Sequence, residues 1–95
     1  MSAHLVVEIE FDLDKDQSNR DKHGVSLADA EQMDLDAVSV VADERRAYGE
    51  VRRQAYGLID GRLHVLVFTM RGEVMRVISL RKANAREVRR YGRKV

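Results

Sequence analysis

Three β-rich runs separated by tight-turn signals fill most of the second half of the chain, and no other feature constrains the fold as strongly. The runs cover residues 51–59, 63–70 and 74–81, and the turn signals are "DG" at 60–61 and "RGE" at 71–73. Asp-Gly between two β-rich runs is typical of a two-residue hairpin connection. The sequence therefore predicts a meander of three antiparallel strands.

The segments around this meander predict the remaining elements. A polar segment that Asp12 or Asp14 can cap predicts a helix reaching about Lys22, and Asn84 with Glu87 is a capping pattern that opens a basic last helix. A first strand, a second helix and a further short strand are expected at residues 5–11, 27–34 and 37–42. The predicted order is β-α-α-β-β-β-β-α, an α+β fold with helices packed against one antiparallel sheet.

A chain of 95 residues predicts one domain, residues 1–95, with a single modest core. The sequence has no cysteine, which excludes a disulfide framework and a thiolate metal site and fits a reducing cytosol. No secretory signal is visible in "MSAHLVVEIEFD", and the longest strongly apolar run, "LHVLVF", is too short to span a bilayer. We therefore expect a cytoplasmic chain that does not contact membranes.

Charge is divided unevenly along the chain. Residues 1–50 hold 5 Lys and Arg against 13 Asp and Glu, a net charge of −8, whereas residues 51–95 hold 12 against 3, a net charge of +9. This division indicates either a surface for polyanions on the basic half or two halves that neutralise each other across the fold.

The stretch "KHGVS" predicts a corner between two helices. Gly24 can take the left-handed conformation that closes a helix, and Ser26 can cap the next one. The corner presents the ammonium of Lys22 beside the imidazole of His23. A histidine at a helix end has a structural role more often than a catalytic one, so the corner alone leaves both roles open.

No metal site and no cofactor are predicted. The three aspartates of "DLDKD" imitate the opening of a calcium loop, but Gln17 stands at the sixth position instead of Gly, and His23 stands at the twelfth instead of Glu. These carboxylates fit the start of a helix better. The three histidines have no metal-ligand spacing, and His64, between Leu63 and Val65, fits a sheet residue.

Charged residues also gather in "DERRAYGEVRR", residues 43–53, which is interpreted as a loop leading into a strand. On an extended segment Glu50, Arg52 and Gln54 share one face because side chains alternate with a period of two. The alternative for this segment is a solvated charged edge.

Ser79 and Arg81 share a face of the apolar run "VMRVISLRKA", whereas Arg76 faces the other way unless a bulge intervenes. Arginines in so apolar a strand need a partner, which is either an internal carboxylate or a phosphate.

In sequence order, "FDLDK…N…KHGVS", "D.R..YGE.R", "G…DGR", "F T.RG…RVIS.RKA" and "E..RY" resemble the BrnT toxins of bacterial type II toxin–antitoxin modules. The resemblance runs from about Phe11 to Tyr91, and "KHGVS" and "R.IS.R.A" are its most specific parts. It implies a ribonuclease toxin domain of RelE-like fold that cleaves RNA without a metal. It also implies neutralisation by a BrnA-like ribbon-helix-helix antitoxin, so that the chain meets DNA only through the complex that represses its promoter. Two departures are Phe11, where the family commonly has Trp, and the polar first helix.

The resemblance and the chemistry of RNA cleavage together assign candidate roles. Cleavage without a metal needs a base for the 2′-hydroxyl, an acid for the leaving 5′-oxygen and cations for the phosphorane. Glu50 and His23 are the candidate base and acid, although their roles can be exchanged. The candidate cations are Lys22, Arg76 and Arg81, and further contacts to RNA are expected from Arg52, Arg62, Ser79 and Tyr91.

Two other classes of function stay open at this stage. One is a nucleic-acid-binding module without catalysis, which the basic half supports by itself. The other is a small protein whose charged faces serve only in assembly with a protein partner.

Overall fold

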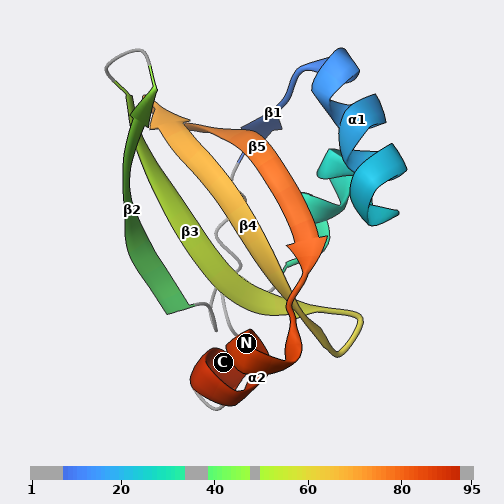
Figure 1. Cartoon of the computed structure of the whole chain (residues 1–95). Helices are drawn as coiled ribbons and strands as arrows, with labels where there is room; N and C mark the ends of the chain where they lie inside the picture. The colour runs from blue at the N-terminus through green and yellow to red at the C-terminus, as the bar shows by residue number, and fades with distance from the viewer. Residues whose placement is uncertain (1–7, 34–38, 48–49, 93–95) are drawn as a thin grey trace, which may run out of the picture.

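The computed structural model describes residues 8–33, 39–47 and 50–92, with the backbone alone for residues 39, 41–47 and 50 (Figure 1). The elements follow one another as β1 (Glu8–Glu10), α1 (Leu13–His23), the 3₁₀ helix η1 (Leu27–Gln32), β2 (Ser39–Ala47), β3 (Glu50–Ile59), β4 (Arg62–Arg71), β5 (Val74–Lys82) and α2 (Ala85–Tyr91). The predicted α+β class is confirmed. In the described ranges, no helix has the length and apolar character needed to cross a bilayer.

The strands form one five-stranded sheet in the order β1-β5-β4-β3-β2 (Figure 1). Strands β2 to β5 are an antiparallel meander, which confirms the prediction from the two turn signals. The expectation of a wholly antiparallel sheet is wrong, because β1 pairs in parallel with β5, from Glu8↔Val74 to Glu10↔Arg76. Side chains alternate between the two faces in parallel and antiparallel strands alike, so the sequence could not show that β1 runs parallel to β5.

Several element boundaries differ from those predicted. Residues 27–32 form a 3₁₀ helix instead of an α-helix, with bonds from the Asp29 N–H to the Ser26 carbonyl and from the Met33 N–H to the Ala30 carbonyl. Strand β2 continues to Ala47, so residues 43–47 are extended and not a loop, and a register shift lies between Ala42 and Arg46. The expected strand positions 5–7 and 37–38 lie outside the described residues.

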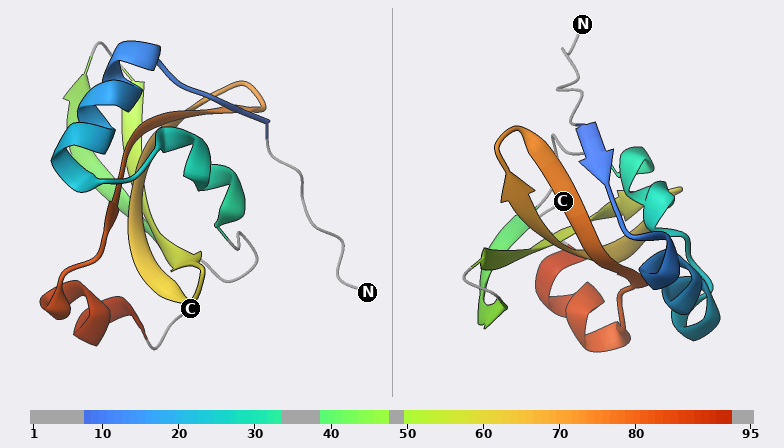
Figure 2. Two further views of the ribbon diagram at one scale, coloured as in Figure 1. Left: turned by 90° about the vertical axis from the view of Figure 1, so that its right-hand side faces the viewer. Right: turned by 90° about the horizontal axis from the view of Figure 1, so that it is seen from above.

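Each face of the sheet has its own apolar cluster. The larger cluster joins η1 and the corner before it to β3, β4 and β5, with Leu27, Leu66 and Leu80 fully buried at its centre. On the opposite face α2 covers the end of the sheet, and its Tyr91 packs against the smaller cluster of Tyr56, Leu63, Val65 and Ala83. The helices therefore lie on both sides of one twisted sheet (Figure 2).

Helix α1 has no apolar stripe, so its attachment to the sheet depends on a buried amide, that of Asn19. Asn19 Nδ2 donates to the carbonyl of Leu80 at 2.7 Å and to the carbonyl of Val25 at 2.8 Å. The Leu80 N–H donates back to Asn19 Oδ1 at 3.3 Å. Because β1 pairs with β5 only as far as Arg76, this side chain satisfies strand groups that no neighbouring strand reaches.

Replacing Asn19 with Ala should lower the free energy of unfolding by about 3 kcal/mol, because it leaves buried backbone groups without partners. Chemical denaturation of the purified chain measures this loss. Gln17→Ala, which truncates an exposed amide on the same helix, is the matched control and should change the free energy of unfolding by less than about 0.5 kcal/mol. Equal stabilities of the two variants would contradict the role given to Asn19.

Candidate active site

A β-bulge in β5 brings three of the candidate residues onto one face of the sheet. Ser79 pairs with Val67 and Val77 pairs with the next residue of β4, Phe68, so that Ile78 has no partner in the ladder. The extra residue reverses the alternation of side chains before it. Arg76 therefore shares a face with Ser79 and Arg81, which is the arrangement that the sequence allowed only if a bulge intervened.

Cross-strand pairing arranges this face in three rows across β3, β4 and β5. Arg52 lies opposite Thr69, one residue before the Arg53↔Phe68 pair, and Thr69 pairs with Arg76. The second row consists of Gln54, Val67 and Ser79. The third row consists of Tyr56, Val65 and Arg81. Helix α2 packs over the third row, so the first two rows form the part of the face that α2 does not cover. We call these two rows the open face.

The corner after α1 is built as the sequence predicts. Asp12 caps the helix by accepting from the backbone N–H groups of Asp14 and Lys15, and Gly24 closes it in the left-handed conformation with φ of 70°. Glycine takes this conformation without steric cost. Ser26 caps η1, with its hydroxyl accepting from the Ala28 N–H.

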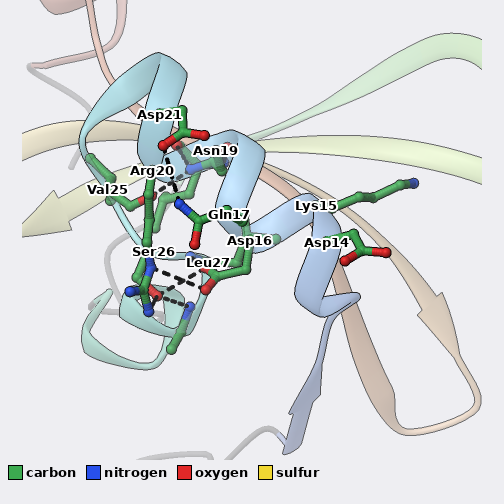
Figure 3. Close-up of polar contacts among 12 residues, drawn as sticks. Asp14, Lys15, Asp16, Gln17, Asn19, Arg20, Asp21, Val25, Ser26 and Leu27 are labelled. Atoms are coloured by element: carbon green, nitrogen blue, oxygen red, sulfur yellow. Dashed lines mark hydrogen bonds and ion pairs between the residues drawn. The ribbon is translucent and has the colours of Figure 1, made fainter.

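The buried carboxylate of Asp16 fixes this corner (Figure 3). It accepts from the Leu27 N–H at 2.7 Å and from the Ser26 hydroxyl at 3.0 Å, and it pairs with Arg20 at 3.1 Å. The hydrogen bond from Leu27 is the main cause that lowers the pKa of Asp16, and Ser26 and Arg20 add to it. Asp16 therefore ties the start of η1 to α1 as an ionised group.

The corner and the bulge meet at a small cleft of about 190 Å³. Lys22 and His23 line it from the last turn of α1, and Ser79 lines it from β5. Lys15, Ser18, Asn19 and Ile78 complete the lining. The side chains of Lys22 and His23 are exposed, and in the described part of the chain no ion pair engages Lys22. We call this hollow the corner cleft.

Arg81 has a carboxylate partner, one of the two kinds of partner that the sequence left open. Its two terminal nitrogens bind the oxygens of Glu87 at 2.7 and 2.8 Å. The hydrogen bond from Arg81 is the main cause that lowers the pKa of Glu87, and the same bond raises the pKa of Arg81. This pair, together with the Asn84–Glu87 capping box, holds the start of α2.

The aromatic rings of Tyr56 and Tyr91 stack at the same end of the sheet. Their centroids are 3.9 Å apart with 16° between the planes, and the guanidinium of Arg90 lies 5.4 Å from the centroid of Tyr91. Burial raises the pKa of Tyr56, and the nearby carboxylate of Glu87 raises it further. Tyr91 is therefore packed on the sheet by its ring, beside the open face.

Arg76 is half-buried and pairs with Glu10 of β1 at 3.4 Å, and the same carboxylate oxygen lies 3.8 Å from Arg71. Arg52 is half-buried too, and no ion pair engages it among the described residues. The open face therefore carries two arginines of different kinds. Arg76 has a solvent-accessible carboxylate partner, whereas Arg52 can bind an anion directly.

Glu50 and Arg62 lie apart from both the corner cleft and the two rows of the open face. Glu50 is the first residue of β3, where it pairs with Ala47, and its side chain lies outside the described part of the structure. Strand β4 separates β3 from β5, and Glu50 lies four residues along β3 from Gln54, the residue in the row of Ser79, so the backbones of Glu50 and Ser79 are about 16 Å apart. Arg62 begins β4 and lines a different and larger cleft. His64 is a buried strand residue of β4, as predicted.

Several residues that shape the site were not singled out from the sequence for that role. Asp16 and Asn19 are spaced three apart on α1, and a helix without an apolar stripe must bury some of its polar residues, so this spacing could have marked them. Glu10 and Tyr56 left no such signal, because their roles depend on which strands become neighbours.

A small α+β protein with an imidazole and a hydroxyl in one cleft, and cations in that cleft and on the adjoining sheet face, has the groups needed to bind and act on a phosphodiester. A family model described as the ribonuclease toxin BrnT of type II toxin–antitoxin systems matches residues 11–87. The chain therefore belongs to the BrnT family, as its motifs indicate. Membership implies an RNA substrate and an antitoxin partner. No curated protein shows significant similarity to this chain.

The lowered pKa of Asp16 predicts how stability depends on pH. Because the folded state favours the ionised form, the contribution of Asp16 is complete above the unfolded-state pKa, about 3.9, and is lost as pH falls through the lower folded-state pKa. Below pH of about 4 the Tm of the wild-type chain should therefore fall more steeply than that of Asp16→Asn. Thermal unfolding over a pH series measures both slopes. Asp21→Asn, an exposed change on the same helix, should keep the wild-type slope, and parallel curves for all three would contradict the role of Asp16.

Proposed function

We propose that this toxin cleaves RNA without a metal, by attack of a 2′-hydroxyl on the neighbouring phosphorus, and that its fold is RelE-like. In this reaction a base removes the proton of the 2′-hydroxyl, and the new P–O2′ bond forms while the P–O5′ bond breaks. An acid then protonates the leaving 5′-oxygen, which gives a 2′,3′-cyclic phosphate and a 5′-hydroxyl. Family membership supports RNA cleavage, and the placement of the candidate residues supports this mechanism.

The observation that carries the proposal is the bulge at Ile78, because it joins the arginine-bearing face to the corner cleft. Arg76 and Ser79 share the open face, and Ser79 also lines the cleft with Lys22 and His23. A phosphate placed at Ser79 then lies between the imidazole on one side and guanidinium groups on the other. Such preorganised cations stabilise the charge that develops on the phosphorane.

His23 and Glu50 are the proposed proton-transfer pair. In-line attack needs the base and the acid on opposite sides of the phosphorus. His23 belongs to α1 and Glu50 to β3, and these two elements lie on opposite sides of β4. In this proposal His23 acts on the phosphate from the α1 side and Glu50 from the β3 side, without contact between the two side chains. Either of them can serve as the base, with the other as the acid.

The proposed phosphate ligands are Lys22, Arg52, Arg76 and Arg81. Glu87 takes two of the five N–H donors of Arg81, so that the guanidinium is oriented and still has donors for an anion. Arg76 can exchange its exposed partner Glu10 for a phosphate, with which arginine forms bidentate contacts.

His23→Ala and Glu50→Gln should each lower the rate of RNA cleavage by about 10²–10⁴-fold, the usual contribution of a positioned acid or base. Arg76→Ala and Arg81→Ala should each lower it by about 10²–10³-fold. The measurement is single-turnover cleavage of a labelled oligoribonucleotide by purified variants whose folding is checked by circular dichroism. Arg53→Ala, which removes an exposed arginine from the opposite face of β3, is the matched control and should keep the wild-type rate.

The same reactions test the chemistry. Products should end in a 2′,3′-cyclic phosphate, and excess chelator should leave the rate unchanged. Near wild-type rates in both the His23 and Glu50 variants would refute their proposed roles. RNA binding without turnover by the wild-type chain would instead favour a nucleic-acid-binding module without catalysis.

We further propose that a ribbon-helix-helix antitoxin contacts α2 and thereby covers the open face. None of the side chains of α2 is buried, Val88 is 47% exposed, and its basic residues are Arg86, Arg89 and Arg90. An amphipathic or acidic segment of the antitoxin fits such a surface. Through the complex with this partner the toxin would reach promoter DNA indirectly.

Val88→Glu should therefore weaken antitoxin binding by at least about tenfold, because it places a carboxylate against an acidic or apolar partner segment. Isothermal titration of the cognate antitoxin into purified variants measures the affinity. Leu13→Glu is the matched control, since Leu13 is an exposed apolar residue at the start of α1, 78% exposed and outside α2. Unchanged affinity for Val88→Glu would place the contact elsewhere.

A further inference from the structure

A second and larger cleft of about 460 Å³ lies on the other side of the same corner. Gly24 and Val25 line it from the corner, Asp29 and Gln32 from η1, and Arg62, His64 and Lys82 from β4 and β5. Ile59 at the end of β3 and Asp60 of the β3–β4 turn complete the lining. We call this hollow the η1 cleft. Its volume is within the range of pockets that hold small organic ligands, about 300–1,000 Å³.

The strand wall of the η1 cleft places two cations close together. His64 pairs with Lys82 across β4 and β5, and Arg62 lies two residues before His64, so Arg62 and Lys82 are diagonal neighbours within reach of long side chains. In the described part of the chain no ion pair engages either cation. Asp29 and Asp60 also line the cleft, but neither pairs with Arg62 or Lys82 in the described part of the chain, so both cations keep their donors for an anion.

The opposite wall is suited to a different part of a ligand. Asp29 and Gln32 of η1 offer carboxylate and amide groups, which are hydrogen-bonding partners for the edges of nucleobases. His64 is buried, and its Nδ1 lies 2.7 Å from the Arg62 carbonyl, so this nitrogen carries the proton and donates to its own strand. The cleft thus has a cationic wall for a phosphate and a polar wall for a base.

The two clefts are lined by consecutive residues of the corner. His23 lines the corner cleft, and the next two residues, Gly24 and Val25, line the η1 cleft. Arg62 and Lys82 share the sheet face of Leu66 and Leu80, whereas Ser79 lies on the open face, so a single-stranded RNA with one phosphate at Ser79 would have to cross the corner to reach the η1 cleft.

We propose that the η1 cleft is a second nucleotide subsite, which holds a nucleotide adjacent to the scissile step through Arg62 and Lys82. This inference rests on the proposed function, because it assumes that the scissile phosphate lies in the corner cleft. It predicts that the enzyme prefers an RNA long enough to fill both clefts over a dinucleotide that fills only the first.

The test compares a dinucleotide with a longer oligoribonucleotide that contains the same cleavage step. The preference is the ratio of kcat/KM for the long substrate to kcat/KM for the short one. It should fall by about tenfold in Arg62→Gln and in Lys82→Gln, the effect of removing one charge-assisted hydrogen bond. Most of the change should be in KM for the long substrate. Arg53→Gln, which removes an exposed charge outside both clefts, should keep the wild-type ratio.

Binding of a long oligonucleotide with a 2′-deoxy sugar at the cleavage step tests the subsite without catalysis. Its affinity should fall in both variants, and the salt dependence, the slope of log K against log salt, should weaken by about 0.7 for each phosphate that the variant no longer binds. This measurement also separates the two proposals. Inactive wild-type protein, or a fully active His23→Ala variant, would refute the proposed mechanism, whereas the binding result judges the subsite by itself.

Three results would overturn the subsite. One is wild-type affinity for the 2′-deoxy oligonucleotide in both variants. Another is an equal loss of kcat/KM on the short and long substrates, which would indicate a general effect on folding or chemistry. The third is weaker antitoxin binding with unchanged RNA binding, which would make the η1 cleft a docking surface for the protein partner.

Discussion

The side-chain amide of Asn19 is the contact on which the arrangement of the site depends. It binds both backbone groups of Leu80 in β5 and the carbonyl of Val25 just after the corner, so it fixes α1, the corner and the sheet in one position. A buried polar side chain that satisfies strand edges replaces the apolar contacts that α1 lacks. Without this attachment, only the packing of Val25 and Leu27 and the contacts of Asp16 would position Lys22 and His23 relative to β5.

The bulge in β5 has the complementary role on the sheet. A regular strand would direct Arg76 into the face that η1 covers, where an unpaired charge is costly. One additional residue, Ile78, turns Arg76 to the same side as Ser79 and leaves Val77 and Leu80 in the core. A local irregularity in pairing therefore separates the apolar core from the cationic face along the same strand.

Local signals in the sequence were sufficient for the meander, the Ser26 cap and the Gly24 corner, and they narrowed the first cap to Asp12 or Asp14, because each of these features depends on a few adjacent residues. The parallel pairing of β1 and the partner of Arg76 depend on which distant segments become neighbours, and no local pattern encodes this. The register of β5 shows where prediction from local sequence ends. The sequence indicates that Arg76 shares a face with Ser79 only if a bulge exists, and the pairing of Ser79 and Val77 with Val67 and Phe68 is what reveals one.

The contact between Asn19 and Leu80 spans 61 residues of the chain, and this has a consequence for the order of folding. Closing so long a loop costs conformational entropy before the contact contributes any stability, so such contacts tend to form late. The corner cleft therefore takes its final form only after β5 has joined the sheet. During synthesis on the ribosome, a chain that ends before Leu80 has no strand to hold the corner, so nascent and truncated chains lack the assembled site.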